Sequence, residues 1–318
     1  MGKIGSTEQG SVSVVIVTFG GDTLPAVLES VGSCPAVAEV ILVNNLDDPP
    51  WPEGVEGRAS RMSDPLRLVH GQGNVGFGAG CNLGVARARG THVLLLNPDC
   101  LPAAGAVERL LALVTAQPDD AWVAGPRLLK ADGTEQSGGR CNAGTPGQWL
   151  GEAFGGPFAA RWGRVNLHRQ PVPAADLVEV PAISGAFMLM PTAFFRRLGG
   201  FDPGYFLYFE DLALCRAARR AGGRVLFAPA VTAVHPKGCS PVSRLVVLGH
   251  KIRSFRRYLF TEFAPEGVPR WQLWGLWALL SAGLLARTVL TGSPFQGDTR
   301  RSRADHPRPS PGPGGAFR

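Results

Sequence analysis

Residues 91–96 form a largely apolar run, THVLLL, that ends abruptly at Asn97-Pro98-Asp99. Runs of this kind are typical of strands buried on both faces of an α/β sheet. Pro98 stops strand pairing, and residues 102–117 then predict a helix. We therefore expect Asp99 at the carboxyl edge of a sheet, where open α/β folds bind ligands. The oxygens of Asn97 and Asp99 suit Mg²⁺ or Mn²⁺, although an Asn-Pro-Asp turn is also common as a purely structural element.

A second acidic position lies within residues 201–235, FDPGYFLYFEDLALCRAARRAGGRVLFAPAVTAVH. An aromatic loop precedes Glu210 and Asp211, which begin a predicted helix, and a predicted strand pair then leads to His235. The helix dipole and the free N–H groups of a helix start keep a carboxylate ionised. The loop aromatics could exclude water and offer ring faces to a sugar, but a capped helix packed on core aromatics has the same pattern.

The chain is long enough, at 318 residues, for one sizeable domain with an appendage. Predicted strands at 11–18, 39–45 and 66–70 alternate with helices over the first 130 residues, which indicates a mostly parallel sheet. Residues 133–176 are rich in Gly, Pro and Arg and lack periodicity, so we expect a long excursion that is ordered by ligand. The six cysteines stand singly, without a Cys-x-x-Cys pair, and are expected to be reduced.

The order of these motifs resembles the family 2 glycosyltransferases, in particular the rhamnosyltransferase-like branch with the GT-A fold. The motifs are SVSVVIVT, EVILVNN, GNVGFGAGCNLG, LLLNPDC, ISGAFMLM and FDPGYFLYFEDLALCRAARRAG. The resemblance covers about residues 12–260. It implies an α/β GT-A-like domain over residues 11–262, with a mostly parallel central sheet and C-terminal helices, that performs an inverting transfer from a nucleotide-diphosphate sugar.

The resemblance also implies roles for individual residues. Asp211 matches the general base that takes the proton of the acceptor hydroxyl, and Glu210 matches a helper that orients or binds the acceptor. Asp99 and His235 match metal-binding positions for Mg²⁺ or Mn²⁺, although a strand-end histidine bonded to backbone is an alternative for His235. The implied donor contacts are Thr18, Asn44, Asn74, Gly76, Asn82, Asn97 and Asp99, and the implied acceptor contacts are Gly185, Tyr208 and Glu210.

Several positions depart from the family pattern. Asn44 stands where a carboxylate usually reads the pyrimidine of the donor, although its carbonyl can still accept from a pyrimidine N3–H. The first strand ends in Thr18-Phe19-Gly20 in place of Thr-Tyr-Asn, and Ala213 replaces a common Asp. A non-catalytic relative that binds sugar nucleotides or glycans therefore stays open as an alternative.

The glycine-rich stretch 73–84 follows the third predicted strand, whereas a dinucleotide-binding fingerprint directly follows the first. Its glycines would let the backbone approach a ligand closely. The family resemblance favours a loop that lines the nucleotide-sugar pocket, with Asn74, Gly76 and Asn82 as its polar and permissive positions. The alternative is a glycine-rich loop that leads into a helix over residues 81–89 and binds no ligand.

The C-terminal quarter of the chain is strongly basic. Residues 236–318 carry thirteen Lys or Arg against four Asp or Glu, a net charge of +9, so the +7 chain leaves −2 for residues 1–235. No recognition motif for nucleic acid accompanies this charge, and a membrane surface fits it better. A basic predicted helix includes Lys251 and Arg257, with Arg253 and Arg256 between them.

Residues 271–286, WQLWGLWALLSAGLLA, contain no charge and carry three tryptophans at helical spacing. Three interpretations stay open for this helix: it lies in the plane of a membrane, spans the membrane, or packs on the domain. We assign residues 263–290 to this apolar helix. Residues 1–10 and 291–318 are expected to be disordered.

The N-terminal segment is polar and does not predict a signal peptide. We therefore expect a cytoplasmic enzyme at the inner face of the cell membrane, with a nucleotide-diphosphate sugar as donor and a lipid-linked or polysaccharide acceptor. L-Rhamnose from dTDP-rhamnose, used in cell-envelope synthesis, is the sugar that the branch implies. A UDP-hexose or UDP-galactofuranose is the alternative donor.

Overall fold

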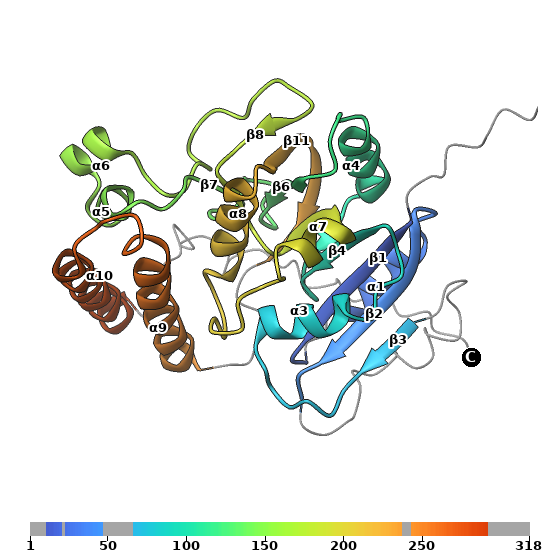
Figure 1. Cartoon of the computed structure of the whole chain (residues 1–318), viewed down its shortest axis with the longest axis horizontal. Coiled ribbons are helices and arrows are strands. Elements are labelled where there is room, and N and C mark those ends of the chain that lie inside the picture. Colours follow the sequence, from blue (N-terminus) through green and yellow to red (C-terminus); the bar gives the residue numbers. More distant parts are fainter. Residues whose placement is uncertain (1–10, 21–22, 47–65, 237–242, 292–318) are drawn as a thin grey trace, which may run out of the picture.

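A computed structural model describes residues 11–20, 23–46, 66–236 and 243–291 (Figure 1). The two terminal segments that the sequence predicts to be disordered lie outside these residues, apart from Thr291, and so does Cys239. The other five cysteines are buried, and of these Cys34, Cys81, Cys100 and Cys215 are free thiols, as expected.

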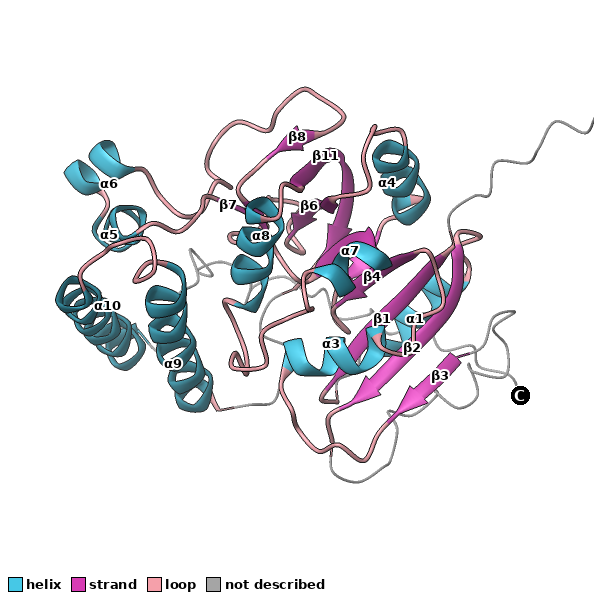
Figure 2. Ribbon diagram, viewed as in Figure 1, coloured by secondary structure: helices cyan, strands magenta, loops and turns pink. Residues whose placement is uncertain are grey.

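The described strands form one large mixed sheet and one small pair. The strands are β1 (Val12–Thr18), β2 (Val37–Asn44), β3 (Leu66–Val69), β4 (His92–Leu96), β5 (Leu101–Pro102), β6 (Trp122–Leu129), β7 (Arg140–Cys141), β8 (Val178–Glu179), β9 (Ala182–Ile183), β10 (Phe187–Pro191) and β11 (Arg224–Val234). In the large sheet of the described residues the order is β3-β2-β1-β4-β10-β6-β11-β5, with β8 beside β11. Figure 2 shows β3, β2, β1 and β4 at one side of this sheet and β6, β11 and β8 at the other. The pairs β3–β2, β2–β1, β1–β4 and β6–β11 are parallel, whereas β10 is antiparallel to β4 and β6. The predicted α/β class with a mostly parallel central sheet is confirmed.

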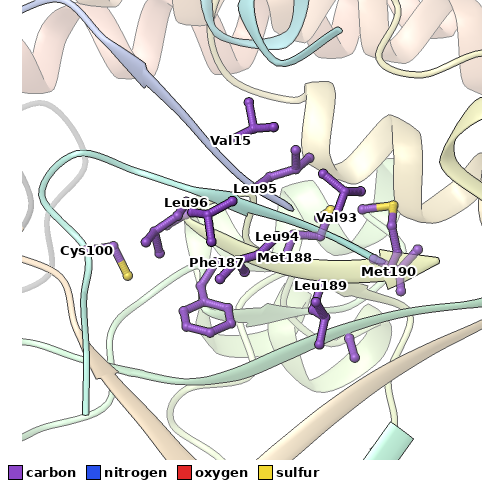
Figure 3. Close-up of a cluster of buried hydrophobic side chains, with 14 of the residues drawn as sticks. Val15, Val93, Leu94, Leu95, Leu96, Cys100, Phe187, Met188, Leu189 and Met190 are labelled. Atoms are coloured by element: carbon purple, nitrogen blue, oxygen red, sulfur yellow. The ribbon is translucent and has the colours of Figure 1, made fainter. Parts of the chain in front are cut away.

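The centre of the sheet is apolar on both faces. All seven residues of β1 and all five of β10 are buried, because helices cover both sides of these strands. Figure 3 shows the side chains of β4 and β10, with Val15 and Cys100 beside them, packed as one cluster. This core makes the end of β4 rigid, and Asn97 follows directly.

The described helices lie around the sheet and at one end of the molecule. They are α1 (Leu24–Gly32), α3 (Phe77–Val85), α4 (Ala106–Thr115), α5 (Pro146–Phe154), α6 (Gly156–Trp162), α7 (Thr192–Arg197), α8 (Glu210–Arg220), α9 (Arg244–Glu262) and α10 (Arg270–Thr291). The helices α5, α6, α9 and α10 gather at the end of the molecule opposite β3 (Figure 1).

The glycine-rich stretch is half helix, which corrects the expectation of a loop followed by a helix over residues 81–89. Helix α3 begins at Phe77, within the glycines. A Cβ on Gly84 would lie 2.3 Å from Cγ1 of Val15, and one on Gly80 would lie 2.8 Å from Cγ1 of Val17. These two glycines therefore permit close packing of α3 on β1 instead of close approach to a ligand.

Two other boundaries differ from the sequence prediction. The helix expected over residues 102–117 begins only at Ala106, because Leu101–Pro102 pair with β11 as the short strand β5. The strand pair expected before His235 is one long strand, β11, whose pairing with β6 shifts register between Ala228 and Thr232. The extra residues at this irregularity explain why the sequence suggested two strands.

The segment 133–176 contains regular structure instead of the expected excursion. Helix α5 starts with a capping box, in which the Thr145 side chain accepts from Gln148 N and the Gln148 side chain accepts from Thr145 N. Trp149 and Leu150 of α5 pack against the cluster formed by α9 and α10. The segment is thereby attached to the C-terminal helices.

Helix α10 packs on the protein with one face and exposes the other. Leu273, Leu276 and Leu280 are buried, whereas Trp271 is 74 % exposed. No helix in the described ranges combines the length and the apolar character needed to cross a bilayer. The interpretation of residues 271–286 as a spanning helix is therefore wrong.

Candidate active site

Strand ends and loop residues meet at one edge of the central sheet. Strands β1, β2 and β4 run parallel and end there at Thr18, Asn44 and Leu96. Strand β10 runs the opposite way, so the residues before it reach the same edge. Asn97 N donates to Ala186 O at 2.9 Å, which ties the Asn-Pro-Asp turn to the entry of β10.

The turn after β4 brings Asp99 to His235. Asp99 Oδ1 lies 3.0 Å from Nε2 of His235, and Asn97 Nδ2 lies 3.3 Å from the same nitrogen. The His235 side chain is 8 % exposed and that of Asp99 is 19 % exposed. Two residues that the sequence separates by 136 positions therefore form one half-buried polar pair.

Gln136 determines which nitrogen of His235 carries a proton. Its Nε2 donates to the main-chain oxygen of His235 at 2.9 Å, so its Oε1 must face the ring, where it lies 3.0 Å from Nδ1. Because Oε1 can only accept, Nδ1 must be the protonated nitrogen. Gln136 was not expected at the site, because no local sequence motif distinguishes it.

The Nε2 atom of His235 thus points toward a carboxylate. Two acceptors 3.0 Å apart are arranged as two ligands of one shared cation would be, and the Asn97 amide lies 3.3 Å from Nε2, where it can donate to that nitrogen. Adjacent ligands of an octahedral ion with bonds of about 2.1 Å are themselves about 3.0 Å apart. The pair therefore fits a divalent ion, with Asn97 as a further oxygen ligand if its amide is reversed. Among the described residues no three His, Cys, Asp or Glu side chains cluster as a metal site, so a donor diphosphate would have to supply the remaining ligands.

Asp211 reaches the same edge from the start of α8. Its Oδ2 accepts from Gly185 N at 3.0 Å, and its Oδ1 accepts from Leu212 N at 2.8 Å. Gly185 precedes Ala186, which holds Asn97, so consecutive main-chain groups connect the two acidic positions. A Cβ on Gly185 would lie 3.3 Å from Cβ of Asp211, a contact that favours glycine here.

Glu210 has a different environment from its neighbour. It is only 6 % exposed, and its Oε2 has no hydrogen-bond partner among the described residues. Burial, and then the charge of Asp211, raises the pKa of this carboxyl well above its usual value. Glu210 therefore favours the neutral form, whereas Asp211 is half-buried at the edge with main-chain donors.

The turn before α8 is strained. Tyr208 and Phe209 have φ values of 69° and 71°, a conformation that residues other than glycine rarely adopt. Ser254 of α9 donates to Leu207 O at 2.8 Å, and Lys251 Nζ lies 4.5 Å from the Tyr208 ring centroid. Helix α9 thus holds the turn that aims α8 at the sheet edge.

Tyr208 is near both acidic positions. Burial is the main cause that raises the pKa of its hydroxyl, and the nearby carboxyl groups of Glu210 and Asp99 raise it further wherever they are ionised. The side chain is still 37 % exposed, so it combines access to solvent with proximity to the site.

The residues expected on the donor side lie around β1, β2 and α3. Thr18 Oγ1 is buried without a hydrogen-bond partner among the described residues, and Asn44 Oδ1 accepts from Leu46 N at 3.1 Å. Asn74 Oδ1 accepts from Gly76 N at 3.2 Å. The amide of Asn82 is bonded on both sides to the Phe201 main chain, at 2.8 and 2.9 Å. The donor roles of these five residues stay predictions.

Comparison with known proteins identifies the family. The family model described as "Glycosyltransferase like family 2" matches residues 9–257. The chain is 28 % identical over 262 residues to the N-acetylglucosaminyl-diphospho-decaprenol L-rhamnosyltransferase of Mycobacterium tuberculosis, covering 76 % of this chain and 82 % of that protein. It is 46 % identical to the rhamnosyltransferase WbbL of Escherichia coli over 52 residues, 16 % of this chain and 20 % of that protein. The hexosyltransferase Agl10 of Haloferax volcanii is 24 % identical over 73 % of this chain and 69 % of its own length.

Solved structures agree in fold. The crystal structure of GalNAc-T7 with UDP, GalNAc and Mn²⁺ superposes with a TM-score of 0.57 at 19 % identity, covering 83 % of this chain and about half, 52 %, of that chain. The structure of TarS residues 1–349 from S. aureus superposes with a TM-score of 0.50 at 12 % identity, over 80 % of this chain and 73 % of that one. The chain therefore belongs to the glycosyltransferase-like family 2, and its α/β domain has the GT-A fold.

Proposed function

We propose that this protein transfers a sugar, with inversion at the anomeric carbon, from a nucleotide-diphosphate donor to a lipid-linked acceptor. The observation that carries the proposal is the meeting of two acidic positions at one sheet edge. Gly185 N holds Asp211, and Ala186 O holds the turn that ends in Asp99. One carboxylate near the acceptor and one near the leaving group are what a single in-line displacement requires.

Asp211 takes the proton of the acceptor hydroxyl in this proposal. Its two oxygens already accept main-chain N–H groups, which fix the orientation of the carboxylate. A carboxylate has further lone pairs, so it can still accept the hydroxyl proton. Tyr208, exposed beside the site, would contact the acceptor, and neutral Glu210 would support the start of α8 from inside.

Asp99 and His235, with Asn97 beside them, would hold Mg²⁺ or Mn²⁺. The ion would neutralise the diphosphate leaving group when bound. Gln136 keeps Nε2 of His235 directed toward Asp99, so the two ligands are positioned before the donor arrives.

The favoured donor is dTDP-L-rhamnose, and the favoured acceptor is a polyprenyl diphosphate that carries a sugar, as in cell-envelope synthesis. Two of the similar proteins are named rhamnosyltransferases, and one of these names a decaprenol-linked acceptor. A hexose donor such as a UDP-hexose is the second candidate, because the relative from Haloferax volcanii is named a hexosyltransferase.

Residues 236–318 are basic, and α10 exposes two tryptophans. Both features support action at the inner face of a membrane. Trp271 is 74 % and Trp274 is 45 % exposed, and tryptophan favours the membrane interface. An enzyme held there would meet a lipid-linked acceptor by diffusion in two dimensions.

The test is transfer by the purified full chain with Mn²⁺ or Mg²⁺, a polyprenyl diphosphate-linked N-acetylglucosamine and a panel of nucleotide sugars. We expect product with dTDP-L-rhamnose at a rate at least about tenfold above that with UDP-hexoses. Faster transfer from a UDP-hexose would show that dTDP-L-rhamnose is not the preferred donor. Binding of nucleotide sugars without transfer or donor hydrolysis would favour a non-catalytic relative.

A further inference from the structure

Helix α6 presents aromatic side chains to solvent. None of its seven residues is buried. Phe154 at the end of α5 is 51 % exposed, and Phe158 and Trp162 of α6 are 42 % and 40 % exposed. Their rings form a row, with centroids 5.5 Å apart for the first pair and 5.6 Å for the second. A contiguous exposed aromatic row marks an interaction surface on a soluble domain.

The tip formed by α5 and α6 is built to hold this row in place. A Cβ on Gly147 would lie 2.7 Å from Cγ of Trp162, and a Cβ on Gly151 would meet Gly163 O at 1.9 Å. These glycines let α6 fold back closely onto α5. Tyr258 of α9 also donates to Ala143 O at 2.8 Å, just before α5. The row is therefore attached firmly to the C-terminal helices.

The exposed face of α10 lies beside this tip. Helix α10 packs against α5, and α5 packs against α6, at the same end of the molecule (Figure 1). Besides its two exposed tryptophans, α10 exposes Leu279 to 51 % and Leu285 to 49 %. Aromatic and aliphatic side chains from two separate parts of the chain thus gather at one end.

The positive net charge of these two segments indicates an anionic partner. Residues 146–164 and 270–291 together contain four arginines, Arg161, Arg164, Arg270 and Arg287, against one acidic residue, Glu152, whose Oε2 accepts from Asn166 N at 3.1 Å. Aromatic side chains accompanied by a net positive charge are typical of segments that lie on anionic lipid.

We propose that the α5–α6 tip and the exposed face of α10 form one contact surface for an anionic membrane. The proposal rests on the proposed function, because it specifies how an enzyme with a lipid-linked acceptor is held at its membrane. It assigns a role to Phe158 and Trp162, which lie in the segment 133–176 that was expected to be a long excursion ordered by ligand.

The test compares three variants of the full chain in co-sedimentation with vesicles. Phe158→Ser/Trp162→Ser removes the tip aromatics, and Trp271→Ser/Trp274→Ser removes those of α10. Leu68→Ser is the matched control, because Leu68 is 38 % exposed on β3 at the opposite end. Thermal melting confirms that each variant is folded.

With phosphatidylcholine–phosphatidylglycerol vesicles, we expect each double variant to bind about tenfold or more weakly and the control to bind like wild type. Binding of all proteins should be much weaker with pure phosphatidylcholine. Unchanged vesicle binding by Phe158→Ser/Trp162→Ser would overturn the proposal. So would a dimer in lipid-free solution that this variant dissociates, because the row would then contact a second copy of the chain.

The same proteins separate this proposal from the proposed function. Transfer to a short, water-soluble acceptor analogue should be equal in wild type and Phe158→Ser/Trp162→Ser. Transfer without any vesicle binding would overturn the membrane surface and leave the glycosyltransfer intact. Vesicle binding that depends on the tip, in a protein that transfers no sugar, would support the surface and reject the function.

Discussion

Asp99 follows a strand of the central sheet, whereas Asp211 is the second residue of a helix, and the two carboxylates are held by different groups. Side chains surround Asp99: His235 contacts it, and Gln136 holds His235. Main-chain N–H groups hold Asp211, at Gly185 and Leu212. The first arrangement places two acceptors face to face, as two ligands of one cation would be, and the second already stabilises a single negative charge. On this difference rests our proposal of a metal and diphosphate site at Asp99 and a general base at Asp211.

Of the substitutions that would test this comparison, Asp211→Asn should reduce the rate of sugar transfer most. The amide keeps the shape of the side chain but cannot take a proton, so we expect kcat to fall about 10²- to 10⁴-fold. Donor binding, measured by isothermal titration with the nucleotide diphosphate and Mn²⁺, should change little. A variant that keeps more than half of the wild-type rate would remove Asp211 from the chemistry and end the comparison.

Asp99→Ala should have the second largest effect, which falls mainly on the binding of metal and donor. Loss of the anionic partner of His235 should weaken the apparent affinity for Mn²⁺ and donor by about a hundredfold, with a smaller fall in kcat at saturating metal. Titration of activity with Mn²⁺ measures this, and excess chelator should stop the wild type. Full wild-type activity in chelator would show that the turn at Asp99 is structural.

Gln136→Leu tests whether the strand-edge site depends on the orientation of His235. Without the acceptor for Nδ1–H, His235 can take the other tautomer, and we expect Mn²⁺ affinity to fall about tenfold. Gln136→Glu keeps an acceptor for Nδ1 and should bind Mn²⁺ more tightly than Gln136→Leu. The measurement is the free Mn²⁺ signal in electron paramagnetic resonance with nucleotide diphosphate present, which needs no turnover. Equal Mn²⁺ affinity in all three proteins would mean that Gln136 only fills space.

The smallest effect on activity should come from Glu210→Gln, because Glu210 already favours its neutral form. We expect its rate to fall far less than that of Asp211→Asn. A folded-state pKa raised above the usual value of 4.5 means that the wild type loses stability as pH rises from that value toward the raised pKa. The glutamine cannot ionise, so its melting temperature relative to wild type should increase with pH. A constant difference across the range would show that Glu210 does not titrate in this window.

The sequence predicted the two acidic positions because both depend on local signals. A buried apolar run that stops at Pro98 has to end a strand, and an acidic pair after an aromatic loop suits a helix start. The structure has both elements where they were expected. It also has His235 beside Asp99, as the family resemblance implied.

Other features could not be inferred from local patterns. Gln136 lies in a stretch without periodicity, and its bond to His235 crosses 99 positions of sequence. The glycines of α3 look like those of a ligand loop, because a glycine that permits helix packing and one that approaches a ligand are identical in sequence. The exposure of Phe158 and Trp162 depends on how α6 folds onto α5.

Local sequence decides where a strand stops, where a helix begins and which residue carries a charge, since backbone geometry and burial pattern act over a few residues. The partner of each charge depends on how distant segments pack. Asp211 is held by Gly185 because β10 runs antiparallel to β4 and enters the sheet at the edge where α8 begins. Asp99 meets His235 because β11, paired with β6, ends beside the turn after β4. Such contacts form only when distant segments pack together in the folded core. They give the two acidic motifs different partners, which the local sequence does not show.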